Sequence, residues 1–400
     1  MMNLSIEEII EKVKAANLKE FGVYHEDIVD KWHKIIASAA DWEGDMALAA
    51  GLDNCDTDRM LLVLLKEDAD KVISGMLLAA KVLGAKHLEL HVPEGESELR
   101  ASLGEKCADQ NIEVVEGFIN TRAFRGKAIH HIETMKALAE IAEGCYEPGT
   151  LTVIKRDGKM NTAVKTAFGT KIADMIGDVS DVKGVMIGTK LYDKATALEV
   201  VIDENLSVGN GVITLISDKQ CIIAEAEKLL LKERQNGCGK CTFCREGLGQ
   251  LHTMTKEITL GQGKASYLDM MKEIGEAMAF STLCSVGQTG AQFTLDSMEK
   301  FANEYTDHIK KKKCTANVCS AFMSIYIDPN TCTGCEECAD VCPVDAIEGK
   351  SGYIHMIDEF ECTKCGKCIS ACDEEAIIQT TGRVPKLPTR LVKVGKFKKR

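Results

Sequence analysis

Hydrophobic and polar positions at the start of the chain follow patterns that predict helices and strands in turn. Ser5 and Glu8 have the spacing of a helix capping box. The apolar residues that follow recur at helical spacing: Ile6, Ile9, Ile10 and Val13. Residues 71–85 predict an apolar helix, and the alternation in residues 87–92 predicts a strand. This rhythm of helix and strand predicts a Rossmann-like α/β domain over residues 1–146.

The pattern then changes to short apolar runs separated by glycine and aspartate. These runs predict strands at residues 151–154, 184–187, 198–202 and 211–216, with one helical piece near residues 171–177. We therefore expect a small mixed β domain over residues 147–218. Helical spacing returns at Cys221 and predicts a helical bundle over residues 219–312. Its expected core residues are Leu229, Leu230, Leu248, Leu251, Met270 and Met271.

Composition narrows the possible functions. The chain has 400 residues, 45% of them hydrophobic, which is enough for two to four domains. Its net charge of −12 and few aromatic residues argue against a general binder of nucleic acid or anionic membranes. No apolar run approaches the length of a membrane span, and the first residues lack the pattern of an export signal. We therefore expect a cytoplasmic protein.

Cysteine is the residue that points to chemistry, because fifteen of the eighteen cysteines lie between Cys221 and Cys372. In a reducing compartment, closely spaced thiols are ligands of metals or clusters more often than disulfides. The three cysteines outside this region are interpreted as ordinary buried thiols: Cys55, Cys107 and Cys145.

Residues 323–382 carry the strongest motif, a C-x2-C-x2-C-x3-C run that occurs twice. In bacterial two-cluster ferredoxins, the fourth cysteine of each such run binds the other cluster. One [4Fe–4S] cluster is therefore assigned to Cys332, Cys335, Cys338 and Cys372. The other is assigned to Cys342, Cys362, Cys365 and Cys368. Asp373 stands where proline usually follows the second run, which leaves the ligands unchanged. A zinc ribbon is the alternative, but the doubled order argues against it.

A third set of cysteines lies in the expected helical bundle. It has the order C-G-K-C-T-F-C-R-E-G, and forty residues after its third cysteine comes another in S-T-L-C-S-V-G. Its members are Cys238, Cys241, Cys244 and Cys284. Here the sequence resembles the flavin-bearing NADH-oxidising subunit of respiratory complex I and its soluble relatives, with Phe243 in place of the usual proline. The resemblance implies a third [4Fe–4S] cluster on these cysteines, with a zinc site as the alternative.

The resemblance extends to the order of the domains. The beta subunits of multimeric electron-bifurcating [FeFe]-hydrogenases have a flavin-type domain, a β-grasp domain of the soluble-ligand-binding type, a cluster bundle and a two-cluster ferredoxin domain. This order matches most of the chain. It implies a multidomain fold of α/β plus α+β type, with the β-grasp domain at residues 147–218.

Four further potential ligands lie near a linker at residues 313–322: Cys221, His308, Cys314 and Cys319. Three thiolates and one imidazole form the closed tetrahedral set typical of structural zinc. Hydrogenase beta subunits carry similar residues at similar places, where they are thought to bind zinc near a hinge. The resemblance therefore supports one Zn²⁺ here. The alternative is a pair of linker thiols and an exposed histidine.

The expected flavin site departs from the family. The family has a glycine-rich G-R-G-G-A-G-F-P loop, whose amides can approach a phosphate because glycine has no Cβ. At the aligned place, residues 18–27 contain one glycine and added acidic residues. Residues 52–58 replace the family's N-A-D-E-x-E-P segment, and its G-E-E-T-A-L loop is missing before residues 130–134. We therefore expect neither FMN nor NADH to bind, and no catalytic residue in the chain.

Charge indicates where partners could dock. Residues 328–375 hold twelve acidic residues and three lysines, which suits docking of a basic partner. Residues 383–400 form a basic tail with eight Lys or Arg residues. This tail is either a solvated end or a strap on an acidic neighbouring subunit.

These features predict an electron-relay and scaffold subunit of a larger oxidoreductase. The resemblance implies partners such as a thioredoxin-like [2Fe–2S] subunit and a catalytic subunit of hydrogenase, formate dehydrogenase or aldehyde oxidoreductase type, with soluble ferredoxin as a further candidate. One alternative is a divergent FMN-containing subunit that oxidises NAD(P)H, with or without electron bifurcation. Another is a structural or redox-sensing module whose clusters mainly order the fold.

Overall fold

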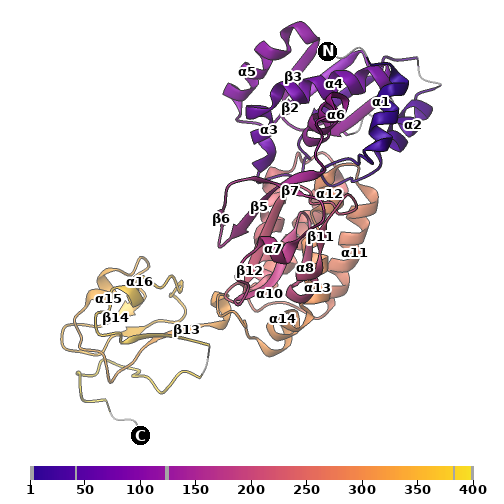
Figure 1. The fold of residues 1–400 in the computed structure, drawn as a ribbon. Helices are drawn as coiled ribbons and strands as arrows, with labels where there is room; N and C mark the ends of the chain where they lie inside the picture. Colours follow the sequence, from indigo (N-terminus) through magenta and orange to yellow (C-terminus); the bar gives the residue numbers. More distant parts are fainter. Residues whose placement is uncertain (1–3, 41–42, 122–125, 382, 398–400) are drawn as a thin grey trace. The chain divides into compact units, whose positions relative to one another are not determined.

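The computed structural model describes residues 4–40, 43–121, 126–381 and 383–397 (Figure 1). The chain divides into two compact units. The first consists of Met1–Asp218, Glu225–Met254 and Ser266–Ala302, and the second of Lys219–Ala224, Thr255–Ala265 and Asn303–Arg400. Within the described ranges, no helix is both long enough and apolar enough to cross a lipid bilayer.

The first unit begins with a parallel four-stranded sheet in the order β3-β2-β1-β4. Its strands are β1 (Ala47–Gly51), β2 (His87–Val92), β3 (Ile112–Glu116) and β4 (Lys127–His131). The central strand β1 is the most buried of the four, and small apolar residues fill it. This strand order is that of a Rossmann half, in which ligands bind beyond the carboxyl ends of the strands.

Helices cover this sheet. They are α1 (Ile6–Ala15), α2 (Ile28–Ser38), η1 (Met60–Leu62), α3 (Val63–Glu67), α4 (Ala69–Leu83), α5 (Ser97–Cys107), η2 (Ala108–Gln110) and α6 (Ile132–Glu143). Ser5 and Glu8 form the predicted capping box of α1. Helices α4 and α6 approach closely at Gly75, where a Cβ would lie 1.8 Å from the carbonyl oxygen of Met135. The helix and strand predicted at residues 71–85 and 87–92 are confirmed as α4 and β2.

The next part of the first unit is a mixed sheet in the order β10-β9-β12-β5-β6, with β7 paired to β5. Its strands are β5 (Gly149–Arg156), β6 (Lys159–Met160), β7 (Val164–Ala167), β9 (Val182–Ile187), β10 (Lys190–Asp193) and β12 (Val212–Ser217). The pair β8 (Thr170–Lys171) and β11 (Val201–Ile202) and the helices α7 (Ile172–Met175) and α8 (Lys194–Glu199) complete it. The strand predicted at residues 198–202 is wrong in its first half, because the Asp193 side chain caps α8 and that helix continues to Glu199.

The helical region follows. Its helices are α9 (Ile222–Asn236), α10 (Thr242–Thr259), α11 (Ser266–Ser281), α12 (Ser285–Thr289), α13 (Gln292–Lys300), α14 (Ala302–Thr306) and the π-helical turn η3 (Asp307–Lys311). The division between the two units falls within α9 and α10. Met271 is buried as predicted, but Met270 is 47% exposed. The prediction for Met270 is wrong because neighbouring residues of a helix point in different directions.

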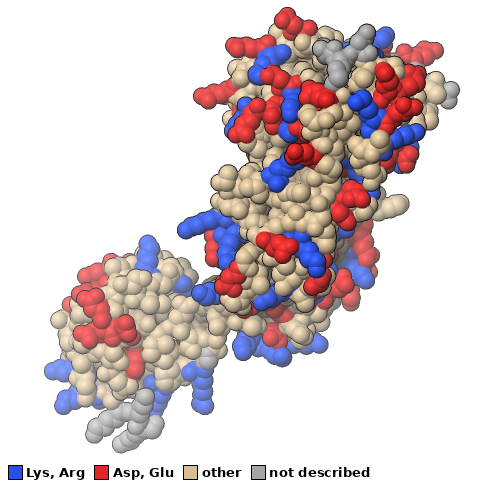
Figure 2. Space-filling view, in the orientation of Figure 1, with Lys and Arg blue, Asp and Glu red and all other residues tan. Residues whose placement is uncertain are grey.

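The second unit contains a small module with two similar halves. Its elements are η4 (Ser320–Phe322), β13 (Ser324–Ile327), α15 (Glu337–Asp340), β14 (Ile347–Glu348), β15 (Met356–Ile357), α16 (Lys367–Ser370) and β16 (Ile377–Thr380). Strand β13 pairs with β16, and β14 pairs with β15, both antiparallel. Acidic side chains gather on the face of this module shown in Figure 2. The fold thus combines mixed α/β parts, including a parallel sheet, with a ferredoxin-like module.

Candidate redox centres and an adjoining pocket

One set of four predicted ligands comes together at the starts of α10 and α12. Cys238 and Cys241 precede α10, Cys244 lies in its first turn, and Cys284 is the N-cap of α12. Burial, followed by the charges of Cys284, Cys241 and Cys238, raises the pKa of Cys244 to about 12. Thiolates this close repel each other unless a cation neutralises them. The donor set therefore fits a metal cluster held by four thiolates.

The loop after β1 is bonded to this set. The Asn54 side-chain amide donates hydrogen bonds to the Cys284 sulfur (3.2 Å) and to the Ile119 carbonyl oxygen (3.0 Å). In return, the Ile119 amide donates to the Asn54 side-chain oxygen (3.0 Å). The Cys55 amide donates to the Ser285 hydroxyl (3.1 Å). The parallel sheet and the four-cysteine set are thus joined by direct polar contacts.

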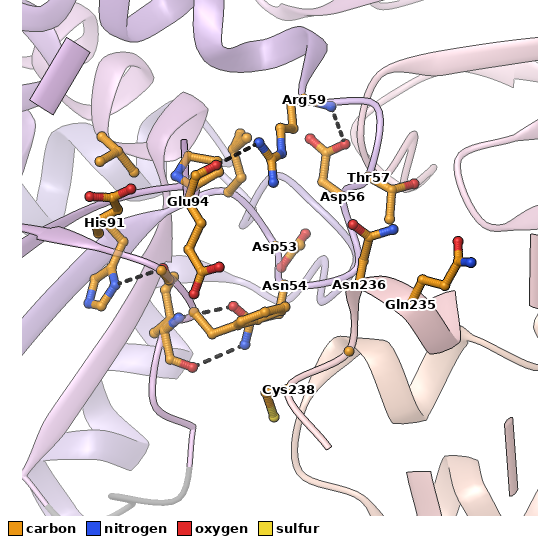
Figure 3. A pocket seen from close by; sticks show the side chains of 18 of the residues that line it. Asp53, Asn54, Asp56, Thr57, Arg59, His91, Glu94, Gln235, Asn236 and Cys238 are labelled. Atoms are coloured by element: carbon orange, nitrogen blue, oxygen red, sulfur yellow. Dashed lines mark hydrogen bonds between the residues drawn. The ribbon is translucent and has the colours of Figure 1, made fainter. Parts of the chain in front are cut away.

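A pocket of about 560 Å³ lies beyond the carboxyl ends of β1, β2 and β3 (Figure 3). His91 and Glu94 lie on one side of it, and Gln235, Asn236 and Cys238 lie on the other. Its wall therefore includes a proposed cluster ligand. The position matches the general rule for ligand sites in open parallel sheets.

Two carboxyl groups in this pocket, the partly buried Asp53 and the buried Asp56, have raised pKa values. Burial raises the pKa of Asp53 to about 7, although a hydrogen bond from the Val23 amide opposes the rise. Burial also raises the pKa of Asp56 to about 6, although a hydrogen bond from the backbone amide of Arg59 opposes the rise. One Asp56 oxygen accepts from the amides of Asp58 and Arg59 (3.1 and 2.9 Å), and the other has no partner among the described residues. The part of the pocket wall around these carboxyl groups is therefore poorly suited to an anion, whereas Arg59 and Lys240 line other parts of it.

In residues 18–27, where the sequence departs from the family's glycine-rich loop, the amides of Phe21 and Val23 donate to side chains elsewhere in the chain. The Val23 amide donates to Asp53 Oδ2 over 2.8 Å, and the Phe21 amide donates to the Thr134 hydroxyl over 2.9 Å. At Gly22, which has a φ of +83°, a Cβ would lie 2.2 Å from the same Asp53 oxygen. The Asp53 side chain thus already occupies the Val23 amide. This segment does not fit the phosphate of FMN.

Behind this segment lies a buried ionic network around Glu20. Glu20 accepts from Lys31 Nζ (2.7 Å) and the Thr134 hydroxyl (2.6 Å), and its Oε2 lies 2.6 Å from His130 Nδ1. The Trp32 indole N–H lies 3.1 Å from His130 Nε2. Because Nε2 accepts from Trp32, the Nδ1–H of His130 donates to Glu20. The network fixes the N-terminal segment against the ends of β4 and α6.

The two ferredoxin-type sets line separate small cavities in the second unit. Cys332, Cys335, Cys338 and Cys372 line one of them. Cys342, Cys362, Cys365 and Cys368 line the other. Each cavity therefore takes three cysteines from one half of the module and one from the other, which is the crossed assignment expected from the sequence. Burial and then the neighbouring charges of Cys332, Cys335 and Cys372 raise the pKa of Cys338 to about 12.

The third kind of donor set is much tighter. Among the described residues, the only group of three or more potential metal ligands within 4.8 Å of one another is Cys221, His308, Cys314 and Cys319. The Cys221 and Cys319 sulfurs are 3.7 Å apart and lie 3.4 and 3.5 Å from His308 Nε2. Two thiolates on tetrahedral zinc, with bonds of about 2.3 Å, lie about 3.8 Å apart. The spacing therefore fits zinc.

The histidine of this set is held in one orientation. His308 lies in the π-helical turn η3, and its Nδ1 lies 2.8 Å from the Glu304 carbonyl oxygen. A hydrogen bond there leaves Nε2 to face the sulfurs, as is common for ligand histidines. All four residues are buried, so the alternative of an exposed histidine is wrong.

Two regions of the chain match known protein families. Residues 226–308 match the family described as the NADH-ubiquinone oxidoreductase-F iron-sulfur binding region. Residues 324–373 match the 4Fe-4S dicluster domain. The NADP-reducing hydrogenase subunit HndC of Solidesulfovibrio fructosivorans is 39% identical over 164 residues, which cover 40% of this chain and 34% of the relative. NADH dehydrogenase [ubiquinone] flavoprotein 1 of Dictyostelium discoideum is 24% identical over 162 residues, covering 38% of this chain and 34% of the relative.

The chain is related to the complex I flavoprotein subunit and to a hydrogenase subunit. An NADH-quinone oxidoreductase subunit of Rhizobium meliloti is 26% identical over a shorter stretch, 27% of this chain and 25% of its own length. The chain thus aligns with about a third or less of these curated relatives. A crystal structure of NAD⁺-reducing [NiFe]-hydrogenase matches the fold with a TM-score of 0.63, at 16% identity, over 76% of this chain and 63% of the other.

Some functional residues escape sequence reasoning. Asn54 belongs to no sequence motif. The sequence identifies Cys55 only as a buried thiol, although its amide donates a hydrogen bond to Ser285, the residue after Cys284. Cys55 is partly exposed and Cys145 is exposed, so the interpretation of these two as buried is wrong, whereas Cys107 is buried. The position of Asn54 next to Cys284 depends on a contact across 230 residues of sequence, which no local pattern encodes.

Proposed function

We propose that this chain is an iron–sulfur electron-relay and scaffold subunit of a larger oxidoreductase, without its own NADH or FMN site. The observation that favours a relay without its own flavin is the hydrogen bond from the Val23 amide to Asp53. Its acceptor is an acidic side chain, and it lies at the segment where we expect the related flavoproteins to receive a phosphate. An acidic side chain and a phosphate at one amide would repel each other.

Three [4Fe–4S] clusters would be held by the sets that contain Cys238, Cys332 and Cys362. When bound, such clusters supply one-electron transfer, with a potential set by their surroundings. The chain's own residues provide the thiolates, the surrounding apolar packing and the hydrogen bonds to sulfur. The tight set of Cys221, His308, Cys314 and Cys319 would bind one structural Zn²⁺, since a closed set of four protein ligands leaves no position for a substrate.

Partners would supply the bond-making chemistry. The acidic surface over the ferredoxin-like module (Figure 2) suits a basic redox partner, which could be a soluble ferredoxin or another subunit. The related proteins carry names of hydrogenase and NADH-quinone oxidoreductase subunits. We therefore propose a thioredoxin-like [2Fe–2S] subunit and a hydrogenase-, formate dehydrogenase- or aldehyde oxidoreductase-type subunit as partner classes.

A second candidate function is a divergent FMN-dependent oxidation of NAD(P)H. The pocket of about 560 Å³ favours it, because the pocket lies beyond the strand ends and reaches Cys238. A flavin held there would need contacts other than those of residues 18–27.

Cofactor analysis of the anaerobically purified chain distinguishes the two functions. Iron, zinc and acid-released flavin are measured per mole of protein. About twelve irons, from three four-iron clusters, with no flavin support the relay function. About one flavin per chain, bleached by NADH or NADPH, would overturn it in favour of the second candidate.

A further inference from the structure

His355 is a buried histidine with unsatisfied ring nitrogens. It is 2% exposed, and neither Nδ1 nor Nε2 has a hydrogen-bond partner among the described residues. A buried polar group without a partner destabilises the folded state, so buried imidazoles are normally hydrogen-bonded. The ring lines the same cavity as Cys332, Cys335, Cys338 and Cys372. The group missing from the vicinity of His355 is therefore the one that the four cysteines would hold.

The backbone fixes the ring in this position. Strands β14 and β15 pair Glu348 with Met356, so the next residues outward, Gly349 and His355, face each other. A Cβ on Gly349 would lie 2.1 Å from His355 Cδ2 and 2.4 Å from Nε2. Glycine at this position thus lets the imidazole pack directly against the opposite backbone.

The two halves of the module differ at this position. In the second half, His355 lies three residues before Asp358 and seven before Cys362, and Cys362 donates its amide to the Asp358 carbonyl oxygen. In the first half, Ile325 lies three residues before Asp328 and seven before Cys332, and the amide of Cys332 donates to Asp328 in the same way. Ile325 lines the other cysteine cavity. Each cavity therefore has one residue at this position, and only His355 can donate a hydrogen bond.

We propose that His355 donates an N–H···S hydrogen bond to the cluster held by Cys332, Cys335, Cys338 and Cys372, and that this bond makes its reduction potential higher than that of the other ferredoxin-type cluster. The physical reason is that reduction adds negative charge to the cluster. An N–H dipole directed at its sulfurs stabilises the reduced form more than the oxidised form. Ile325 gives the other cluster no such donor. The assignment rests on the proposed function, since it needs both clusters to be present.

Reciprocal substitutions in the full chain test the proposal. The midpoint potential of each cluster is measured by redox titration followed by EPR, together with iron content. His355→Leu removes the donor at similar side-chain size and is expected to lower the potential of one cluster and leave the other unchanged. His355→Gln retains an N–H donor and is expected to restore part of the shift. Ile325→His introduces a donor at the equivalent position and is expected to raise the potential of the second cluster.

The outcomes separate this proposal from the proposed function. If the native chain holds clearly fewer than about twelve irons, the cluster assignment itself is contradicted. Full iron content with unchanged potentials in His355→Leu would overturn the role of His355 alone. If His355→Leu loses iron, the comparison of native protein with Ile325→His decides: a raised second potential supports the proposal, and an unchanged one overturns it.

Discussion

The side-chain amide of Asn54 donates a hydrogen bond to the sulfur of Cys284 over 3.2 Å. Asn54 follows the central strand of the parallel sheet, and Cys284 begins α12, so this contact connects the pocket wall to a proposed cluster ligand. Hydrogen bonds to ligand sulfurs help to set the potentials of iron–sulfur clusters.

Replacing Asn54 by Leu is therefore expected to lower the midpoint potential of the cluster held by Cys238, Cys241, Cys244 and Cys284. The N–H donor that favours the more negative reduced form is lost. EPR-monitored redox titration checks this. Asn161→Leu is the control, because Asn161 also bonds a backbone amide, that of Ile154 (2.7 Å), but belongs to the β5–β6 hairpin. Equal potentials in both variants would contradict a role for Asn54.

Asp53 is expected to make the fold less stable at alkaline pH. Burial raises its pKa from 3.8 to about 7. Between these pH values the carboxyl group is protonated in the folded state and ionised in the unfolded state. The stabilisation from this proton is complete below pH 4 and is lost as pH rises through about 7. Asp53→Asn stays neutral and should be more stable than the native chain at pH 8, by up to about 4 kcal/mol.

Thermal unfolding at pH 5.5 and pH 8 measures the effect of Asp53→Asn. The comparison is with Asp109→Asn at an exposed position. Other buried acids, such as Glu133 and Glu233, also have raised pKa values, but they are common to both variants and cancel in the difference. A stability difference between the variants that does not change with pH would rule out titration of Asp53 as its source.

His308→Ala is expected to abolish zinc binding at the set of Cys221, His308, Cys314 and Cys319 while leaving about twelve irons per chain. Three remaining thiolates no longer complete the tetrahedral set. Metal analysis by mass spectrometry measures both elements. His33→Ala, at an exposed position of α2, should retain one zinc per chain. The zinc assignment would be contradicted if the His308 variant retained as much zinc as the native protein. It would also be contradicted if the native protein held no zinc.

Glu20→Gln is expected to reduce the free energy of unfolding by about 3 kcal/mol, because it leaves the buried Lys31 ammonium with only the partly exposed Glu26, 3.6 Å away, as a counter-ion. Although burial opposes ionisation of Glu20, the charge of Lys31 and the hydrogen bond from His130 hold its pKa below the ordinary value. The contribution of Glu20 is therefore present above pH 4.5 and is lost as pH falls further. Denaturant unfolding checks this, with exposed Glu7→Gln as the control. A loss no larger than that of the control would contradict the importance of this ion pair.

Local patterns in the sequence predict much of the fold. The capping box at Ser5, helix α4 and strand β2 follow from residue spacing alone, since each depends on contacts within a few residues. The start of the predicted strand at residue 198 is wrong because residues 194–199 form helix α8, which begins at the Asp193 cap. Apolar spacing alone does not reveal this competing helix. Met270 fails because periodicity alone does not fix which face of α11 meets the core.

The candidate sites show the same division. Cysteine motifs predict which thiols belong together, and the structure brings all the predicted sets together. Motifs say nothing of Asn54, Asp53 or His355, whose positions depend on the tertiary fold. Asp53 in particular stands out in the sequence only as part of a replaced segment. Its contact with Val23 requires β1 and the N-terminal segment to meet, which residue type does not encode.

The set of Cys221, His308, Cys314 and Cys319 also has a consequence for chain entropy. Cys221 and His308 lie 87 residues apart in sequence, and nearly all the helices of the central region fall between them. A metal on both would close this long loop in the unfolded chain. Loop-closure entropy grows only with the logarithm of loop length, by about 0.6 kcal/mol for each doubling. Insertions within the helices between these ligands would therefore change the stabilising effect of such a cross-link very little.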